Sequence, residues 1–338
     1  MSVDGWFFTG NISDARYWHT ASVLSNGKVL VTGGYNGNIG YSNSAELYDP
    51  STGIWTTTGN MTNVRYSHTV SVLSNGKVLV TGGWGDNIIL GSAELYDSST
   101  GIWTTTGNMT NARSYHTASV LSNGKVLVTG GYSGYTGILN SAELYDLSTS
   151  IWTTTGSMTN ARSGHKTSVL SSGKVLVSGG AINSGTLNST ELYDSSTGIW
   201  TTTGNMTNAR AGHTASVLSN GKVLVTGGLG NLNIYLNSAE LYDPSTGTWT
   251  TTGNMTNARY YHTASVLSNG KVLVTGGLNN DSASNSAEVY DSPTGTWITT
   301  SNMSNARKYH TASVLSNGIV LVTGGDDNNN ALNSAELY

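Results

Sequence analysis

The amino-acid sequence predicts an all-β fold: a seven-bladed β-propeller of four-stranded antiparallel blades, whose ring is closed by the N-terminal strand completing the last blade. Three observations lead to this prediction. A unit of 48 or 49 residues recurs seven times, each unit holds four short strand-like segments, and the segment missing from the last unit stands at the start of the chain. Thin four-stranded units of this length bury their faces only by stacking on their neighbours around an axis.

Residue types that occur once per unit mark the repeat. All arginines of the chain fall at 16, 65, 113, 162, 210, 259 and 307, and the histidines and glutamates follow the same period. A length of 338 residues would ordinarily suggest two domains. Because the period runs from end to end, we expect a single propeller domain over residues 1–338 instead.

Each unit contains four candidate strands. With 43 glycines, no cysteine and three prolines, the composition favours short strands joined by tight turns. "HTASVLS" and "KVLVTGG" are joined by Asn-Gly, for which a type I′ hairpin turn is expected. "SAELYD" and "WTTTGNM" supply the third and fourth strands on either side of the turn "PSTG".

The ends of the chain complement each other. The chain stops at "NSAELY", after a third strand, whereas Trp6 precedes Arg16 by ten residues, as Trp55 precedes Arg65. We therefore expect residues 5–12 to form the fourth strand of blade 7. Blades 1–6 then occupy about 16–304, and the first three strands of blade 7 about 307–338.

Four matched positions resemble the kelch repeat. They are the glycine pair that ends the second strand, "ELYD" on the third, a Trp six residues before a Met on the fourth, and the Arg-x-x-His that follows. The resemblance covers essentially the whole chain and implies a seven-bladed kelch propeller, as in the kelch adaptors and the propeller domain of galactose oxidase. These relatives differ in function, so the fold alone assigns none. A copper centre of the galactose-oxidase type needs a cysteine to crosslink its tyrosine, and this chain has none.

The residues repeated in every blade are interpreted as framework. Arginine and glutamate in equal number suggest a buried ion pair, because an unpaired buried charge is costly. The seven histidines are expected to be structural, since no His-Glu-x-x-His pattern brings two metal ligands together. Glycine pairs are expected to allow close approach of an adjacent blade, and the repeated Trp and Tyr to fill the space between blades.

Several function classes are not expected. The chain has no Gly-x-Ser-x-Gly elbow and no P-loop, so we expect no catalytic residue, no metal, no cofactor and no enzymatic activity. A net charge of −4 with 10% charged residues does not suit a nucleic-acid partner. No apolar run approaches the roughly 20 residues that span a bilayer, and "MSVDGWFFTG" lacks the apolar region of a signal peptide. We expect no membrane insertion and a monomer, with a cytoplasmic and a secreted location both open.

The seven copies differ mainly at the two residues after each arginine and in the loop between the second and third strands. Both connections lie on the same rim of an antiparallel blade. Eleven of the 18 tyrosines and two of the nine tryptophans lie outside the framework, and all of them fall in these two windows. Aromatic side chains are enriched at binding surfaces. The predicted ligand-binding residues are Tyr17, Trp18, Tyr35, Tyr66, Trp84, Tyr115, Tyr132, Tyr260, Tyr261 and Tyr309.

The leading functional interpretation is a non-enzymatic binding or scaffold module that recognises a protein or peptide partner on this face. A carbohydrate-binding, lectin-like propeller is the first alternative, because Tyr, Trp and Asn also suit sugar faces and hydroxyls. An accessory domain of a larger enzyme or surface protein is the second.

Overall fold

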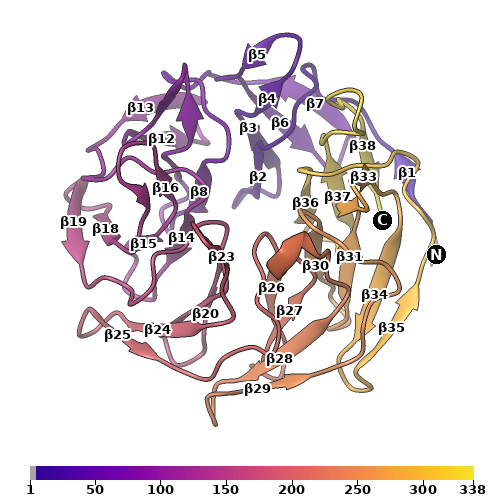
Figure 1. The fold of residues 1–338 in the computed structure, drawn as a ribbon. Coiled ribbons are helices and arrows are strands. Elements are labelled where there is room, and N and C mark those ends of the chain that lie inside the picture. The colour runs from indigo at the N-terminus through magenta and orange to yellow at the C-terminus, as the bar shows by residue number, and fades with distance from the viewer. Residues whose placement is uncertain (1–4) are drawn as a thin grey trace.

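Seven four-stranded antiparallel sheets surround a central axis in the computed structural model, which describes residues 5–338 (Figure 1). Within each blade the first strand lies nearest the axis and the fourth lies at the outer edge, and in blades 1–6 the four strands pair in chain order. The predicted fold is confirmed.

The strands of the first three blades are short and nearly identical in position. Blade 1 contains β2 (Thr20–Val23), β3 (Val29–Thr32), β6 (Ala45–Asp49) and β7 (Ile54–Thr57). Blade 2 contains β8 (Thr69–Val72), β9 (Val78–Thr81), β12 (Ala93–Asp97) and β13 (Ile102–Thr105). Blade 3 contains β14 (Thr117–Val120), β15 (Val126–Thr129), β18 (Ala142–Asp146) and β19 (Ile151–Thr155).

The remaining blades repeat this pattern. Blade 4 contains β20 (Lys166–Val169), β21 (Val175–Ser178), β24 (Thr190–Asp194) and β25 (Ile199–Thr202). Blade 5 contains β26 (Thr214–Val217), β27 (Val223–Thr226), β28 (Ala239–Asp243) and β29 (Thr248–Thr251). Blade 6 contains β30 (Thr263–Val266), β31 (Val272–Thr275), β34 (Ala287–Asp291) and β35 (Thr296–Thr299). Blade 7 contains β36 (Thr311–Val314), β37 (Val320–Thr323), β38 (Ala335–Leu337) and β1 (Phe7–Phe8).

The loop between the second and third strands carries extra structure in most blades. Small hairpins there are β4–β5 (Tyr35–Asn36, Gly40–Tyr41), β10–β11 (Trp84–Gly85, Ile88–Ile89), β16–β17 (Tyr132–Ser133, Gly137–Ile138), β22–β23 (Ala181–Ile182, Gly185–Thr186) and β32–β33 (Leu278–Asn279, Ser282–Ala283). Blade 5 has a 3₁₀ turn, η1 (Asn231–Asn233), in the same place.

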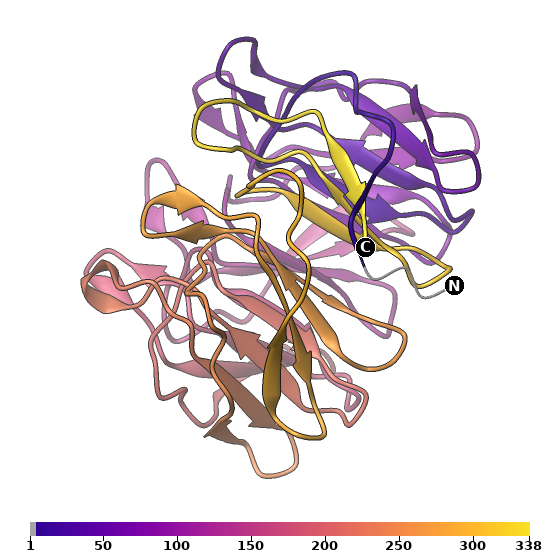
Figure 2. The same ribbon diagram turned by 90° about the vertical axis from the view of Figure 1, so that its right-hand side faces the viewer.

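The N-terminal strand closes the ring. β1 pairs antiparallel with β38, with Phe7 opposite Leu337 and Phe8 opposite Glu336, in the blade that also holds the C-terminal strand (Figures 1 and 2). The predicted closure is confirmed. Because the last blade combines β1 with the last three strands of the chain, opening the ring there requires the loss of a strand pair.

The turn between the first and second strands differs from the expected type. Leu24 accepts a hydrogen bond from the amide of Gly27, and Gly27 alone in this turn has a positive φ, 82°. A type I′ turn would need positive φ at both central residues. The prediction of type I′ is therefore wrong: the turn is type I, and Gly27 takes the left-handed position of a G1 bulge. The Asn26 carboxamide instead accepts a hydrogen bond from the Lys28 amide at 3.1 Å.

Apolar and aromatic side chains pack between neighbouring blades. At the seam of blades 1 and 7, buried Val29 and Tyr48 contact Leu315 and Leu321. The Tyr48 hydroxyl lies 2.9 Å from Thr9 Oγ1, and the Trp55 indole donates to the Gly10 carbonyl at 2.6 Å. Burial of each such side chain contributes about 1.5–3 kcal/mol. The predicted role of the repeated Tyr and Trp is confirmed.

The glycine pairs permit a close approach of the next blade. A Cβ on Gly33 would overlap the Arg65 carbonyl oxygen and lie 2.8 Å from His68 Cε1. The φ of 63° at Gly33 is also one that other residues rarely adopt. The expectation of close blade approach is confirmed.

The repeated arginine and glutamate form a buried ion pair in every blade. The Nη2 to Oε1 distance is between 2.7 and 2.9 Å in all seven, and both side chains are almost entirely buried. The Arg65 guanidinium also donates to the carbonyl of Gly82, and the Glu94 carboxylate accepts from the Thr62 amide. The predicted pair is confirmed, and it fastens two loops of one blade to each other.

Candidate functional site

The first residue after each arginine joins the two variable loops of its own blade. The Tyr17 amide donates to the Tyr35 carbonyl at 3.0 Å, and the Tyr35 amide donates to the Tyr17 carbonyl at 2.9 Å. The same bridge recurs as Tyr66–Trp84, Ser114–Tyr132, Ser163–Ala181, Ala211–Leu229, Tyr260–Leu278 and Lys308–Asp326. The two sets of loops thus form one surface, which we call the variable face.

The second residue after each arginine belongs to a ring of backbone hydrogen bonds around the axis. Each of these residues donates its amide to the carbonyl of its counterpart in the preceding blade, with N···O distances from 2.9 to 3.4 Å. In chain order the members are Trp18, Ser67, Tyr115, Gly164, Gly212, Tyr261 and Tyr309. The Trp18 amide donates to Tyr309, so the ring is continuous.

This ring imposes a left-handed backbone on all seven members. Their φ angles lie between 50° and 62°. Glycine adopts such angles freely, and blades 4 and 5 have glycine at this position. Trp18, Tyr115 and Tyr261, with φ of 53°, 52° and 53°, adopt the same conformation at a cost of about 1–2 kcal/mol each. Large aromatic residues therefore occupy positions whose backbone geometry favours glycine.

Nine of the ten predicted ligand-binding residues form one chain of ring contacts across the variable face. Centroid distances between consecutive rings run from 3.8 to 6.4 Å in the order Tyr132, Trp84, Tyr66, Trp18, Tyr309, Tyr261, Tyr260, and Tyr17 and Tyr35 extend it from Trp18. The tenth, Tyr115, forms none of these ring pairs but lines a cavity together with Trp18, Tyr261 and Tyr309. Sequence reasoning had not placed Tyr41 and Tyr235 in this set, although Tyr41 stacks on Tyr66 at 5.4 Å and Tyr235 lies 6.2 Å from Tyr260.

The arc is interrupted over blades 4 and 5. Gly164, Ala181, Ala211 and Gly212 form the floor of a groove of about 360 Å³ there. Aromatic residues form its walls: Tyr66, Trp84, Tyr115 and Tyr132 on one side, and Tyr260 and Tyr261 on the other. We call this space the aromatic groove.

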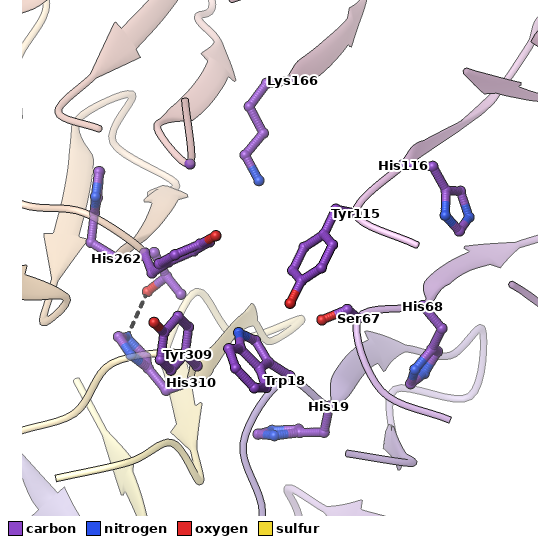
Figure 3. Close-up of a pocket in the computed structure, with 13 residues that line it drawn as sticks. Trp18, His19, Ser67, His68, Tyr115, His116, Lys166, His262, Tyr309 and His310 are labelled. Carbon is purple, nitrogen blue, oxygen red and sulfur yellow. Dashed lines mark hydrogen bonds between the residues drawn. The ribbon is translucent and has the colours of Figure 1, made fainter. Parts of the chain in front are cut away.

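A second cavity lies on the axis beside the groove. It has a volume of about 270 Å³, and Tyr115, Gly212 and Tyr261 line both spaces. Its other walls include Trp18, Ser67 and Tyr309 from the backbone ring, and Lys166 (Figure 3). We call it the axial cavity.

Sequence reasoning missed Lys166. The residue after the repeated histidine is threonine in six blades and lysine only in blade 4, where Lys166 begins β20. This single departure from the repeat was the available signal.

The repeated histidines bridge neighbouring blades around the cavity. His68 Nε2 lies 2.9 Å from Thr20 Oγ1 and 3.3 Å from Thr32 Oγ1 of the preceding blade. Burial, aided by the charge of Arg65, holds the pKa of His68 well below its usual value, so the ring is neutral at pH 7. The expected structural role is confirmed for Nε2, whereas Nδ1 has no hydrogen-bond partner among residues 5–338.

Five tyrosines of the variable face have raised pKa values and carry protons at neutral pH. Burial is the main cause that raises the pKa of Tyr17 and of Tyr66 to about 12, and it raises the pKa of Tyr260, Tyr261 and Tyr309 as well. These five side chains therefore present neutral hydroxyls, each able to donate and to accept a hydrogen bond.

The opposite rim is built from repeated residues. A cavity of about 600 Å³ between blades 4 and 5 is lined there by Lys174, Lys222 and Asp243, all of them members of repeated turns. Lys222 and Asp243 form an ion pair at 3.0 Å, and five other blades have the equivalent pair. The uniformity of this rim leaves the variable face as the candidate site.

Two family models match the chain. The Attractin/LZTR1 beta-propeller matches residues 127–338, and the KLHDC2/KLHL20/DRC7 Kelch-repeats domain matches residues 3–180. No curated protein matches the chain significantly. Among solved structures, a fungal alcohol oxidase of the AA5 family, in complex with copper, is similar with a TM-score of 0.80 and 19% identity, over 99% of this chain and 76% of the oxidase chain. A likeness at this identity supports the fold alone.

The copper centre implied by that likeness does not fit the residues present. The chain has no cysteine, and residues 5–338 contain no group of three or more His, Asp or Glu residues that could hold a metal ion. The Nε2 atoms of the repeated histidines already form hydrogen bonds with hydroxyls of the preceding blade.

Within residues 5–338, no helix is long and apolar enough to span a membrane.

Proposed function

The chain belongs to the kelch-repeat β-propellers, and we propose that it is a non-enzymatic binding module whose variable face takes a protein or peptide partner. Kelch-repeat propellers commonly act as protein-interaction modules. The proposal assigns binding to the aromatic groove and to the aromatic arc around it.

One observation carries the proposal. Trp18, Tyr115, Tyr261 and Tyr309 keep large rings at left-handed positions where Gly164 and Gly212 meet the same backbone demand without strain. Backbone strain of this kind concentrates at functional sites, because the fold alone would favour its removal. Retention of four aromatic residues at such positions supports a role for their side chains in recognition.

The chemistry of the face suits a peptide. Tyrosine and tryptophan give large contact areas at a small cost in side-chain entropy and are enriched among residues that dominate binding energy. The floor of Gly164, Ala181, Ala211 and Gly212 leaves room for a main chain between the aromatic walls. The protonated tyrosines supply donors and acceptors for its amide groups.

The test compares the wild-type protein with a variant carrying Trp18→Gly, Tyr115→Gly, Tyr261→Gly and Tyr309→Gly. Glycine is chosen because blades 4 and 5 already have it at this position. The control variant carries Ile102→Thr and Ile199→Thr on exposed outer strands, where blades 5 and 6 have Thr248 and Thr296. A displayed peptide library and a glycan array are probed with all three proteins, and dissociation constants of the selected ligands are measured.

We expect selected peptides that bind the wild type and the control equally and bind the glycine variant at least 10-fold more weakly, with similar melting temperatures. Equal binding by all three proteins would contradict the assignment of the face. Glycan ligands with no peptide ligands would replace the proposal by the lectin alternative. Oxygen consumption with primary alcohols after copper loading would contradict the non-enzymatic part.

A further inference from the structure

Lys166 is a cation that projects into the axial cavity without a counter-ion. Figure 3 shows its amine pointing toward the space between Tyr115, Trp18 and Tyr309. Its charge helps to lower the pKa values of His165, His213 and His262, which are neutral bases and not counter-ions. Burial alone lowers the pKa of Lys166, with no carboxylate acting against it. Within residues 5–338, the other lysines form ion pairs with aspartates, whereas Lys166 forms none.

A second polar group of the same cavity has no partner, and a third lies beside a tyrosine hydroxyl. Trp18 Nε1 is buried and makes no hydrogen bond with any residue of the described chain. The Ser67 hydroxyl lies beside that of Tyr115, with which it interacts (Figure 3). An indole N–H can only donate, and a serine hydroxyl can donate through its rotating proton. A buried donor left without an acceptor costs about 1–3 kcal/mol. Three donors, one of them charged, therefore line one small cavity whose tyrosine hydroxyls are neutral acceptors and whose lining includes no carboxylate to pair with Lys166.

The position of Lys166 in the fold is specific to blade 4. In the other blades the equivalent threonine bonds to a hydroxyl on the second strand and to the histidine of the next blade, as Thr20 does with Thr32 and His68. In blade 4, only Ser178 reaches His213, at 3.1 Å. Lys166 thus lacks the hydrogen bonds that the equivalent threonines make. Its side chain lines both the axial cavity and a second cavity of about 340 Å³ further along the central axis.

We propose that the axial cavity is a binding site for a small organic carboxylate, with Lys166 as counter-ion and Trp18 Nε1 and Ser67 Oγ as hydrogen-bond donors to its oxygens. A carboxylate presents two oxygens that together accept these donors, and its single charge matches the single cation. The walls formed by Tyr115, Tyr261 and Tyr309 suit an aromatic or apolar stem. This site shares Tyr115 and Tyr261 with the aromatic groove, but the proposal rests on Lys166 and not on the peptide-binding role of the variable face.

The experiment uses phenylacetate as probe and phenylacetamide as its neutral counterpart, with inorganic phosphate as a second anion. Dissociation constants are measured by calorimetry at low ionic strength for the wild type, Lys166→Met, Lys166→Thr and the control Lys174→Met, whose lysine lies on the opposite rim. The indole N–H resonance of Trp18, assigned with Trp18→Phe, is followed by NMR. Lys166→Met keeps the length of the side chain, and Lys166→Thr restores the residue of the other six blades.

We expect the wild type and Lys174→Met to bind phenylacetate at least 10-fold more tightly than phenylacetamide, with a shift of the Trp18 resonance on binding of the carboxylate. Both Lys166 variants should bind the two probes within about 2-fold of each other. Equal binding of the probes by the wild type, no binding of phenylacetate, or an undiminished preference in Lys166→Met would overturn the proposal. Tighter binding of phosphate than of phenylacetate would overturn the assignment to carboxylates. These results do not depend on whether a peptide partner is found.

Discussion

Arg113 Nη2 lies 2.7 Å from Glu143 Oε1, and both side chains are fully buried. The same guanidinium donates to the Gly130 carbonyl at 2.8 Å, and the same carboxylate accepts from the Thr110 amide at 2.7 Å. One ion pair therefore holds both loops that carry the variable residues of blade 3. Its seven copies provide a rigid base beneath a surface whose residues differ from blade to blade.

Loss of one partner should destabilise the protein strongly. In Glu143→Gln the Arg113 charge stays buried without its counter-ion, so we expect the free energy of unfolding to fall by about 3–5 kcal/mol. Thermal and denaturant unfolding measure this fall. The control Lys125→Gln removes the half-exposed ion pair with Asp146 on the opposite rim and should have a much smaller effect. Equal effects of the two substitutions would show that the buried pair adds no stability.

Stability should decrease as the pH falls below about 6.5. Burial holds the pKa of His19 at about 3 and the pKa values of the other six histidines well below the ordinary value, whereas in the unfolded chain they titrate near 6.5. The unfolded state therefore binds more protons below pH 6.5, and unfolding becomes easier by up to about 1.4 kcal/mol per histidine and per pH unit. Melting temperatures from pH 8 to pH 5 check this prediction. A constant melting temperature over that range would rule out buried neutral histidines.

Two glycines of blade 3 allow the stability cost of backbone strain to be measured apart from the cost of a steric clash with the next blade. Gly130 and Gly124 both have positive φ, 55° and 79°, but a Cβ on Gly130 would lie 2.8 Å from His165 Cε1 of the next blade, whereas nothing lies within 4 Å at Gly124. Gly124→Ala should cost about 1 kcal/mol from strain, and Gly130→Ala about 1–3 kcal/mol more from overpacking. Chemical unfolding of the two variants gives the difference. Similar losses of stability in the two variants would mean that the contact between blades 3 and 4 adjusts to the added methyl group at little cost.

Lys166→Thr should stabilise the protein. A threonine there can bond to Ser178 and His213 as Thr117 bonds to Thr129 and His165, with distances of 2.9 and 3.0 Å. It would also remove an uncompensated cation from the channel, so we expect a gain of about 0.5–1.5 kcal/mol from the hydrogen bond alone. A lower melting temperature in this variant would show that the lysine itself supports the ring.

Much of the fold could be predicted because the sequence repeats every 48 or 49 residues and each repeat corresponds to one blade. Arg65, His68 and Glu94 recur at fixed spacing, and a residue repeated in every blade at one position must meet the same surroundings in each. The burial of the arginine and glutamate followed from the cost of an unpaired charge. The type of turn at Asn26 and Gly27 could not be predicted in this way, because Asn-Gly suits more than one hairpin geometry and the twist of the paired strands selects among them.

The sequence by itself determined the seven blades, the ring closure through residues 5–12, the buried ion pairs and the single face on which the copies differ, since each of these follows from periodicity and from the cost of burying charge. Only the tertiary structure decided how the variable residues are arranged around the axis. The backbone ring through Trp18, Gly164 and Tyr261 and the meeting of Lys166 with Ser67 in one cavity join residues from different blades. Such contacts depend on the closure of the ring around its axis, and no spacing within a single repeat encodes them.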